Sequence, residues 1–189
     1  MSLNSHIIEI RKFIPSTICK KIILYFENSN DLTDANIVDP VNPINKDIRN
    51  CKQKLISGNT NSFGETLVLN YIKFKIKESV EIYKKKHPST NTTVIEDIIF
   101  LKYETNNHNS GYLFHTDQGA AVPKRALSIS ICLNNEFQGG EFMFDINGEK
   151  LNYPQNVGDL IIFPSNFMFP HQVNKIKSGT RFALVTWVC

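Results

Sequence analysis

The second half of the chain constrains the fold most, because it is a succession of short β-forming segments separated by turn residues. Asn147-Gly148 is a strong signal for a two-residue hairpin, and Gly139-Gly140 marks another turn. Short strands at such regular spacing are typical of a β-sandwich or barrel. The strand-forming runs, from about residue 94 onward, are IEDIIFLKYE, RALSISICLN, GEFMFD, VGDLIIF and TRFALVTWV.

The first half predicts helices that cover one face of this β core. β-forming residues before Pro15 predict a strand, and Ser16 or Thr17 is expected to cap the helix that follows. Residues 28–47 are rich in Asn, Asp and Pro and are expected to form a loop; a loop of this length is often a lid or binding segment. A second helix is expected at about 63–86, where apolar residues recur every three or four positions: Leu69, Ile72, Ile76, Val80 and Tyr83.

Length and composition predict a single α+β domain over residues 1–189. The N-terminal helical support is expected at about 1–90 and the β core at about 94–189. Of the 189 residues, 41% are hydrophobic and 21% are charged, which excludes a disordered chain, a collagen-like chain and a coiled coil.

Charge and hydropathy exclude several kinds of partner. The net charge is only +3, and no aromatic residues interleave with the lysines of the second helix, so we expect no nucleic-acid binding. No apolar run approaches the roughly 18–20 residues of a membrane span, and the N-terminus lacks a secretory signal pattern. The four scattered cysteines are expected to be reduced thiols, with two disulfides as the alternative. We expect a soluble, cytoplasmic protein with no membrane partner; its oligomeric state is left open.

Two strands indicate which of their faces points into the core. In Ala126–Leu133 the large apolar residues alternate with small ones, and the small face, which includes Ser130, leaves space for a ligand. In Thr180–Val188, Arg181 shares a face with three apolar residues: Ala183, Val185 and Trp187. A buried arginine is costly unless an anion meets it, so Arg181 predicts an anionic ligand inside the barrel.

Three residues have the character of metal ligands. His115 and Asp117, in F-H-T-D, are two residues apart, which on a strand or its extension places both side chains on one face. His171, after the strand LIIF, is the best third ligand. Two histidines and one carboxylate suit Fe(II), because they leave positions open for substrate and dioxygen. The remaining histidines are expected to be surface residues: His6, His87 and His108.

From Tyr103 to Trp187 the sequence resembles the iron- and 2-oxoglutarate-dependent dioxygenases of the prolyl 4-hydroxylase group. The matching segments are, in order, G-Y-x-x-H-x-D, a strand ending in L-N, F-x-G-G-E-F-x-F, G-D-L-I-I-F-P-S, and P-H-x-V followed by G-T-R-F-A-L-V-T-W. The first half is similar in its order of strand, helix, loop and long helix, although residues 28–62 match poorly. The resemblance implies a double-stranded β-helix, a jelly-roll or cupin-like barrel, with the N-terminal helices packed on one sheet.

The resemblance also implies the cofactors. His115, Asp117 and His171 would be ligands of Fe(II), and 2-oxoglutarate and dioxygen would be co-substrates. Hydroxylation of the substrate would accompany the conversion of 2-oxoglutarate to succinate and carbon dioxide. Ascorbate binding is a further expectation from the resemblance.

Three more residues are assigned to the co-substrate by the same resemblance. Arg181 would pair with the distal carboxylate of 2-oxoglutarate, because a guanidinium group forks onto a carboxylate with two parallel hydrogen bonds. Tyr103 matches a tyrosine that hydrogen-bonds the co-substrate. Where relatives carry a second tyrosine, this chain has Cys132, whose thiol is a weak donor. Ser130 or another donor is therefore expected to take its place.

Three functions follow as hypotheses. The first is hydroxylation of a peptidyl residue, proline above all, with a peptide or protein as substrate. The second keeps this chemistry but acts on a free amino acid or another small molecule. The third is a non-catalytic barrel that binds a metal or a small anion. Fold and cofactor do not fix the substrate.

Overall fold

The computed structural model describes residues 2–27, 29–37, 39, 41–56, 62–105 and 110–189. Its helices are a short 3-10 helix η1 (Leu3–His6), α1 (Ser16–Phe26) and α2 (Phe63–Lys86). Its strands are β1 (Ile8–Ile10), β2 (Thr33–Asp34), β3 (Arg49–Asn50), β4 (Lys52–Ile56), β5 (Ile98–Glu104), β6 (Gly111–His115), β7 (Leu127–Cys132), β8 (Phe137–Gly139), β9 (Phe142–Ile146), β10 (Glu149–Tyr153), β11 (Leu160–Pro164), β12 (His171–Val173) and β13 (Ile176–Val188).

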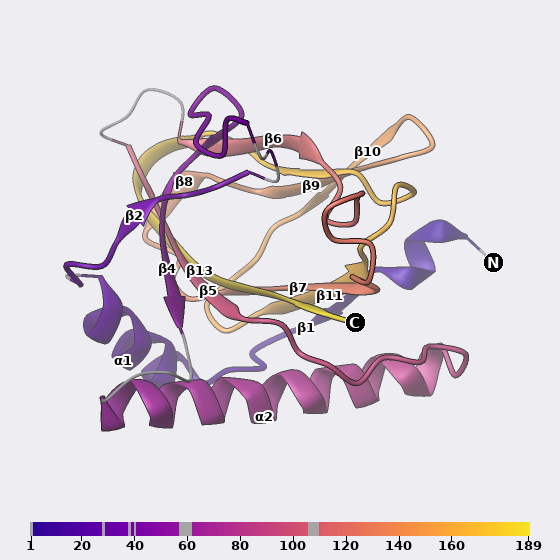
Figure 1. Cartoon of the computed structure of the whole chain (residues 1–189), viewed down its shortest axis with the longest axis horizontal. Helices are drawn as coiled ribbons and strands as arrows, with labels where there is room; N and C mark the ends of the chain where they lie inside the picture. The colour runs from indigo at the N-terminus through magenta and orange to yellow at the C-terminus, as the bar shows by residue number, and fades with distance from the viewer. Residues whose placement is uncertain (1, 28, 38, 40, 57–61, 106–109) are drawn as a thin grey trace.

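The strands form two sheets that face one another (Figure 1). Within the described residues, the larger sheet has eight strands, in the order β1-β11-β7-β13-β5-β4-β2 with β8 paired to β13. The smaller sheet has five strands, in the order β10-β9-β12-β6-β3. The named strands pair antiparallel in both sheets. The expected double-stranded β-helix is confirmed.

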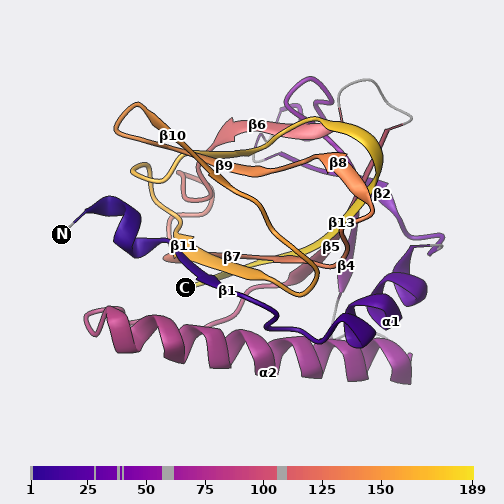
Figure 2. The same ribbon diagram turned by 180° about the vertical axis from the view of Figure 1, so that it is seen from behind.

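Both long helices pack on the outer face of the larger sheet, as expected (Figure 2). Their apolar residues share one hydrophobic cluster with the large side chains of β7 and the alternate side chains of β13, including Phe182 and Leu184. The strand faces expected from sequence are therefore confirmed, because the small residues of β7 are left to point between the sheets. In this way the helices close one side of the molecule and leave the space between the sheets for a site.

The helix α2 has the bounds expected from its apolar period. Ser62 is its N-cap residue and accepts a hydrogen bond from the backbone N–H of Glu65. The five apolar residues expected on one face are all buried. The helix α1 differs in its cap: it begins at Ser16 with Pro15 in the N-cap position, and no side chain caps it. The expected cap by Ser16 or Thr17 is therefore wrong, because Ser16 already lies in the first helical turn.

Part of the segment before α2 forms strands that the sequence does not predict. The expected loop at 28–47 contains β2, and β3 and β4 follow it. The strand β2 is only two residues long and pairs with β4 at the edge of the larger sheet. Such a strand is held by backbone hydrogen bonds, so it leaves no alternation of apolar side chains to detect. Residues 28, 38, 40 and 57–61 lie outside the described residues, as does His108.

The two expected turns are present. Asn147 and Gly148 both have positive φ, 54° and 83°, as the hairpin between β9 and β10 requires. Gly139 and Gly140 also have positive φ. A Cβ on Gly140 would lie 3.1 Å from Cδ of Arg181, so this glycine leaves room for that arginine.

The structure also bears on the state of the cysteines and on whether a helix could span a membrane. The four cysteines are free thiols, three of them buried. Over the part of the chain that the structure describes, neither helix is long and apolar enough to cross a lipid bilayer.

Asp159 ties the connection after β1 to the turn before β11, and its replacement is expected to destabilise the fold. Its carboxylate accepts hydrogen bonds from Arg11 Nη1 and from the backbone N–H groups of Lys12 and Asn156, each at 2.8 Å. Burial by itself raises the pKa of this carboxyl, but these hydrogen bonds outweigh it and hold the pKa below its usual value. Asp159→Asn is expected to lower the free energy of unfolding at pH 7 by about 1–3 kcal/mol, measured by urea denaturation.

The pH dependence gives a second readout on Asp159. Because the folded-state pKa lies below the usual value of 3.8, the stabilisation is present above that value and is lost as the pH falls through the folded-state pKa. The stability difference between wild type and Asp159→Asn should therefore shrink in acid. Asp47→Asn, at an exposed position, serves as the control. An unchanged difference from pH 7 down to strong acid would contradict this prediction.

Candidate metal centre

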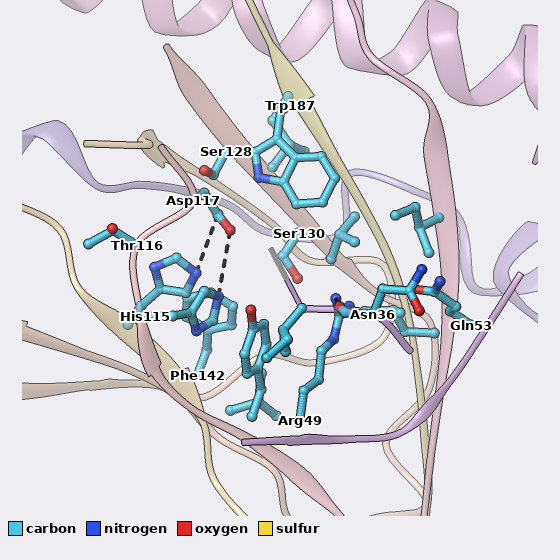
Figure 3. Close-up of a pocket in the computed structure, with 18 of the residues that line it drawn as sticks. Asn36, Arg49, Gln53, His115, Thr116, Asp117, Ser128, Ser130, Phe142 and Trp187 are labelled. Carbon is cyan, nitrogen blue, oxygen red and sulfur yellow. Dashed lines mark hydrogen bonds and ion pairs between the residues drawn. The ribbon is translucent and has the colours of Figure 1, made fainter. Parts of the chain in front are cut away.

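The structure brings together the three residues that the sequence selects. His115 ends β6 and lies directly across from His171, the first residue of β12. Asp117 follows two residues after His115. The Nε2 atom of His115 lies 3.5 Å from Asp117 Oδ1, and that of His171 lies 3.4 Å from Asp117 Oδ2 (Figure 3). One ligand atom from each residue lies within 4.8 Å of the others.

Backbone carbonyls fix the tautomers of both histidines. Nδ1 of His115 lies 2.8 Å from the carbonyl oxygen of Leu113, and Nδ1 of His171 lies 3.1 Å from that of Phe169. A carbonyl only accepts, so each Nδ1 carries the hydrogen and each neutral ring presents a lone pair at Nε2. Metal-binding histidines are commonly oriented in this way, by a carbonyl that accepts from the ring nitrogen that does not bind the metal.

The electrostatics favour an ionised Asp117 beside a neutral His171. Burial, helped by the neighbouring His115, lowers the pKa of His171 to about 4, so this ring is neutral at pH 7. Burial by itself raises the pKa of Asp117, but His171, His115 and a hydrogen bond from Ser128 hold it well below its usual range. The site therefore presents one negative charge and nitrogen lone pairs.

Aromatic rings hold the two imidazoles in place. The ring of Tyr112 stacks on His115, with centroids 3.5 Å apart and planes 15° from parallel. The ring of Phe142 stacks on His171, with centroids 5.1 Å apart and planes 13° from parallel. Phe163 adds an edge contact to His171. These ring contacts restrict the rotation of the two imidazole side chains.

These donors fit a divalent metal such as Fe(II). Two nitrogen lone pairs and a carboxylate converge on one point, and only a cation satisfies all three without protonation. Three protein ligands would leave further coordination positions on such a metal open for other groups.

A cavity of about 230 Å³ lies beside the three residues, between the two sheets. Its walls come from β4, β5, β7, β11 and β13 of the larger sheet and from β3, β6, β9 and β12 of the smaller one. Asn36 and Ile37, from the loop expected at 28–47, also line it. The expectation that this loop contributes to binding agrees with that position.

Arg181 lines the cavity from β13, and its side chain is only 2% exposed. Its Nη2 donates to Gln155 Oε1 at 3.1 Å, and its guanidinium carbon lies 5.5 Å from the ring centroid of Tyr103. Among the described residues, no carboxylate lies within ion-pair distance of Arg181. A buried cation without a counter-charge is the arrangement expected of an anion site.

Tyr103 and Ser130 also line the cavity, and both are buried. The thiol of Cys132 donates to the carbonyl oxygen of Asn134 at 3.1 Å. The polar neighbour of Arg181 is instead Gln155, from the turn between β10 and β11. Sequence reasoning missed Gln155, because nothing local marks a glutamine in a turn as pointing into the core.

Two other arginines line the cavity. Arg125 pairs with Glu96 at 2.8 Å and lies 3.6 Å over the ring of Trp187, so it is neither exposed nor unpaired. Arg49, on β3, is also buried. Sequence reasoning missed Arg49, since its strand is two residues long and lies in the segment that matches the family poorly. A two-residue strand shows no alternation of apolar side chains that would reveal which way Arg49 points.

Sequence comparison identifies the class of protein. Residues 98–189, the β-rich part of the chain, match the model of the 2OG-Fe(II) oxygenase superfamily. Among curated proteins it is similar to PKHD-type hydroxylases: one from Crocosphaera subtropica is 28% identical over 130 residues, and one from Colwellia psychrerythraea is 25% identical over 150. These alignments cover 66% and 76% of this chain. They cover only 53% and 65% of the two relatives, so the chain spans about half to two thirds of their length.

Solved structures give the same fold. A prolyl hydroxylase from Trichoplax adhaerens, in complex with a peptide fragment of the hypoxia inducible factor oxygen degradation domain, has a TM-score of 0.81 at 18% identity, with 98% of this chain and 84% of that chain covered. A prolyl-4-hydroxylase from Pseudomonas putida has a TM-score of 0.73 at 16% identity, with 97% and 91% covered. The resemblance to the prolyl 4-hydroxylase group is confirmed.

Proposed function

We propose that this protein is an Fe(II)- and 2-oxoglutarate-dependent dioxygenase that hydroxylates a peptidyl proline with release of succinate and carbon dioxide. One observation carries the proposal: two imidazole lone pairs and a carboxylate converge at a cavity that also contains the unpaired Arg181. A metal and a dianion are together what these groups require. A non-catalytic barrel has no need of both.

Each residue then has a task. His115, Asp117 and His171 hold the iron, which when bound supplies the redox chemistry for oxidising a C–H bond. Arg181 binds the distal carboxylate of 2-oxoglutarate and thereby orients the molecule toward the three ligands. Gln155 positions the guanidinium group, because it accepts from Nη2. Tyr103 and Ser130, which also line the cavity, are assigned as further hydrogen-bond donors to 2-oxoglutarate.

The packing excludes water from the reacting groups. Phe142 and Phe163 pack against His171, and Trp187, which lies under Arg125, lines the cavity. Water exclusion strengthens the pairing of Arg181 with a carboxylate, since the same charges interact more strongly in a low dielectric.

A peptide substrate is supported by the solved prolyl hydroxylase that holds a peptide and by the names of the other relatives. We further propose a single domain over residues 1–189, a cytoplasmic location, and ascorbate as a reductant that the protein binds. A free amino acid or another small molecule is the alternative substrate.

The test is mass spectrometry of proline-containing peptides incubated with protein, Fe(II), 2-oxoglutarate and ascorbate. We expect a gain of one oxygen on proline, with succinate formed in equal amount. The Asp117→Ala variant in the same mixture is the control. Binding of Fe(II) and 2-oxoglutarate without any oxygen transfer to peptides or to free proline would contradict the proposed activity.

A further inference from the structure

Arg49 is a second buried arginine in the cavity, and it differs from Arg181 in its surroundings. It lies on β3, paired in register with Tyr112 of β6, and its side chain is 8% exposed. Its Nη1 donates to the carbonyl oxygen of Asn36 at 2.7 Å, while its Nε has no hydrogen-bond partner. A buried N–H group of a charged side chain without a partner is costly, which points to a missing ligand.

No acidic side chain neutralises this arginine. Across the described residues, no carboxylate lies within ion-pair distance of Arg49. Arg125, which also lines the cavity, does have such a partner, because it pairs with Glu96. Keeping Arg49 charged inside the protein without a counter-ion is energetically costly unless a ligand supplies the opposite charge.

The charges of the loaded site leave one positive charge over. Fe(II) and the Asp117 carboxylate together carry one positive charge, and Arg181 and Arg49 add two. The two carboxylates of 2-oxoglutarate remove two of these three. Arg125 does not enter the balance, because Glu96 already neutralises it. The remaining charge matches one further carboxylate.

The position of Arg49 places this charge beside the reacting centre. Its guanidinium carbon lies 4.8 Å from the ring centroid of Tyr112, and the same ring stacks on His115. Figure 3 shows Arg49 at the end of the cavity that also holds the amides of Asn36 and Gln53, away from Asp117. A group bound there adjoins the metal site without belonging to it.

We propose that Arg49 binds a carboxylate of the substrate, so that this protein selects substrates with a carboxylate close to the carbon that is hydroxylated. The inference rests on the proposed function and narrows its substrate class. The carboxylate has two possible sources, the C-terminal carboxyl of a short peptide or free amino acid, and an acidic side chain next to proline. Both present the same chemistry to the guanidinium group.

Binding of small probes tests the proposal directly. The probes are N-acetyl-L-proline and N-acetyl-L-prolinamide, which differ only by a carboxylate and an amide. They are titrated into anaerobic protein loaded with Fe(II) and 2-oxoglutarate, and binding is followed by calorimetry and by the fluorescence of Trp187, the single tryptophan of the chain. We expect the carboxylate probe to bind about 10- to 100-fold more tightly to the wild type.

Variants assign that preference to Arg49. Arg49→Gln should bind the two probes with affinities within about threefold of each other, and Arg49→Lys should keep part of the preference, because it retains the charge but loses the planar fork. Arg11→Gln, which removes a cation outside the cavity, is the control and should keep the whole preference. Free L-proline and the pair N-acetyl-Pro-Glu-amide and N-acetyl-Pro-Gln-amide then show which source of the carboxylate binds best.

Other results would overturn the proposal. Equal affinity of the wild type for the acid and the amide in every pair, or no measurable binding of any acid probe, means that Arg49 does not select a carboxylate. A preference that survives in Arg49→Gln has the same meaning. If Arg49→Gln loses 2-oxoglutarate affinity as strongly as the alanine variant of Arg181, then Arg49 binds the co-substrate and not the substrate.

Failure of the proposed function is a separate outcome. It would appear as a wild-type protein that takes up neither Fe(II) nor 2-oxoglutarate, whereas the acid and amide probes can still be compared on that protein. Melting temperatures of all variants, followed by circular dichroism, show that the fold is intact. A merely structural role of Arg49 in holding Asn36 would lower the melting temperature without changing the ratio of the two probe affinities.

Discussion

Asp117→Ala is expected to reduce succinate formation by at least about a thousandfold. Loss of a residue that only hydrogen-bonds to a metal ligand typically costs about 10- to 100-fold in metal affinity or activity, and loss of a ligand itself costs more. In this site the carboxylate is also the group toward which both Nε2 atoms point, at 3.4 and 3.5 Å. Its removal takes away the negative charge as well as one of three donors.

The fold is expected to survive this change. The core clusters consist of apolar side chains from both sheets and both helices, and none of them depends on a metal. The melting temperature of Asp117→Ala should therefore be nearly that of the wild type, whereas its Fe(II) affinity should be strongly reduced. Asp97→Ala, at an exposed position, serves as the control and should retain full activity. Succinate formation near the wild-type rate in Asp117→Ala would exclude this residue as a ligand.

Arg181→Ala is expected to weaken 2-oxoglutarate binding by about two orders of magnitude or more. Breaking a buried charge pair typically costs about 3–5 kcal/mol, and each 1.4 kcal/mol is about tenfold in affinity. The structure supports the premise, because Arg181 is almost fully buried and its nearest polar neighbour, Gln155, is neutral. Fe(II) affinity should change much less, since a guanidinium group stays protonated and has no lone pair to offer a metal.

The measurement is an anaerobic titration of Fe(II) and 2-oxoglutarate, followed by the visible charge-transfer band of the complex. Arg181→Lys should be intermediate, because lysine keeps the charge but cannot fork onto a carboxylate. Gln155→Leu tests the positioning role and should weaken 2-oxoglutarate binding less than Arg181→Ala does. If Arg181→Ala keeps the wild-type affinity, another cation holds the co-substrate, and Arg49 is the one in the same cavity.

The sequence by itself determined the features that depend on local period and local chemistry. The three- and four-residue spacing of apolar side chains predicted α2 with its bounds, and the alternation along β7 and β13 predicted which residues face the helices and which face the cavity. Asn147-Gly148 predicted the hairpin because few other pairs tolerate two positive φ values. The H-x-D spacing placed His115 and Asp117 on one side of the chain.

The tertiary structure alone decided how distant residues meet, and it added two that the sequence did not single out. His171, which the sequence had selected, lies across from His115 because of the register between β12 and β6, and Gln155 reaches Arg181 from a turn between two strands. Arg49 enters the cavity on a two-residue strand that pairs with β6 at the edge of the smaller sheet. Such contacts join residues far apart in the chain, and their partners are chosen by strand pairing and by the desolvation of charged groups. Strand pairing and desolvation produce no periodic pattern of residues around Arg49 or Gln155, so the sequence alone does not reveal these contacts.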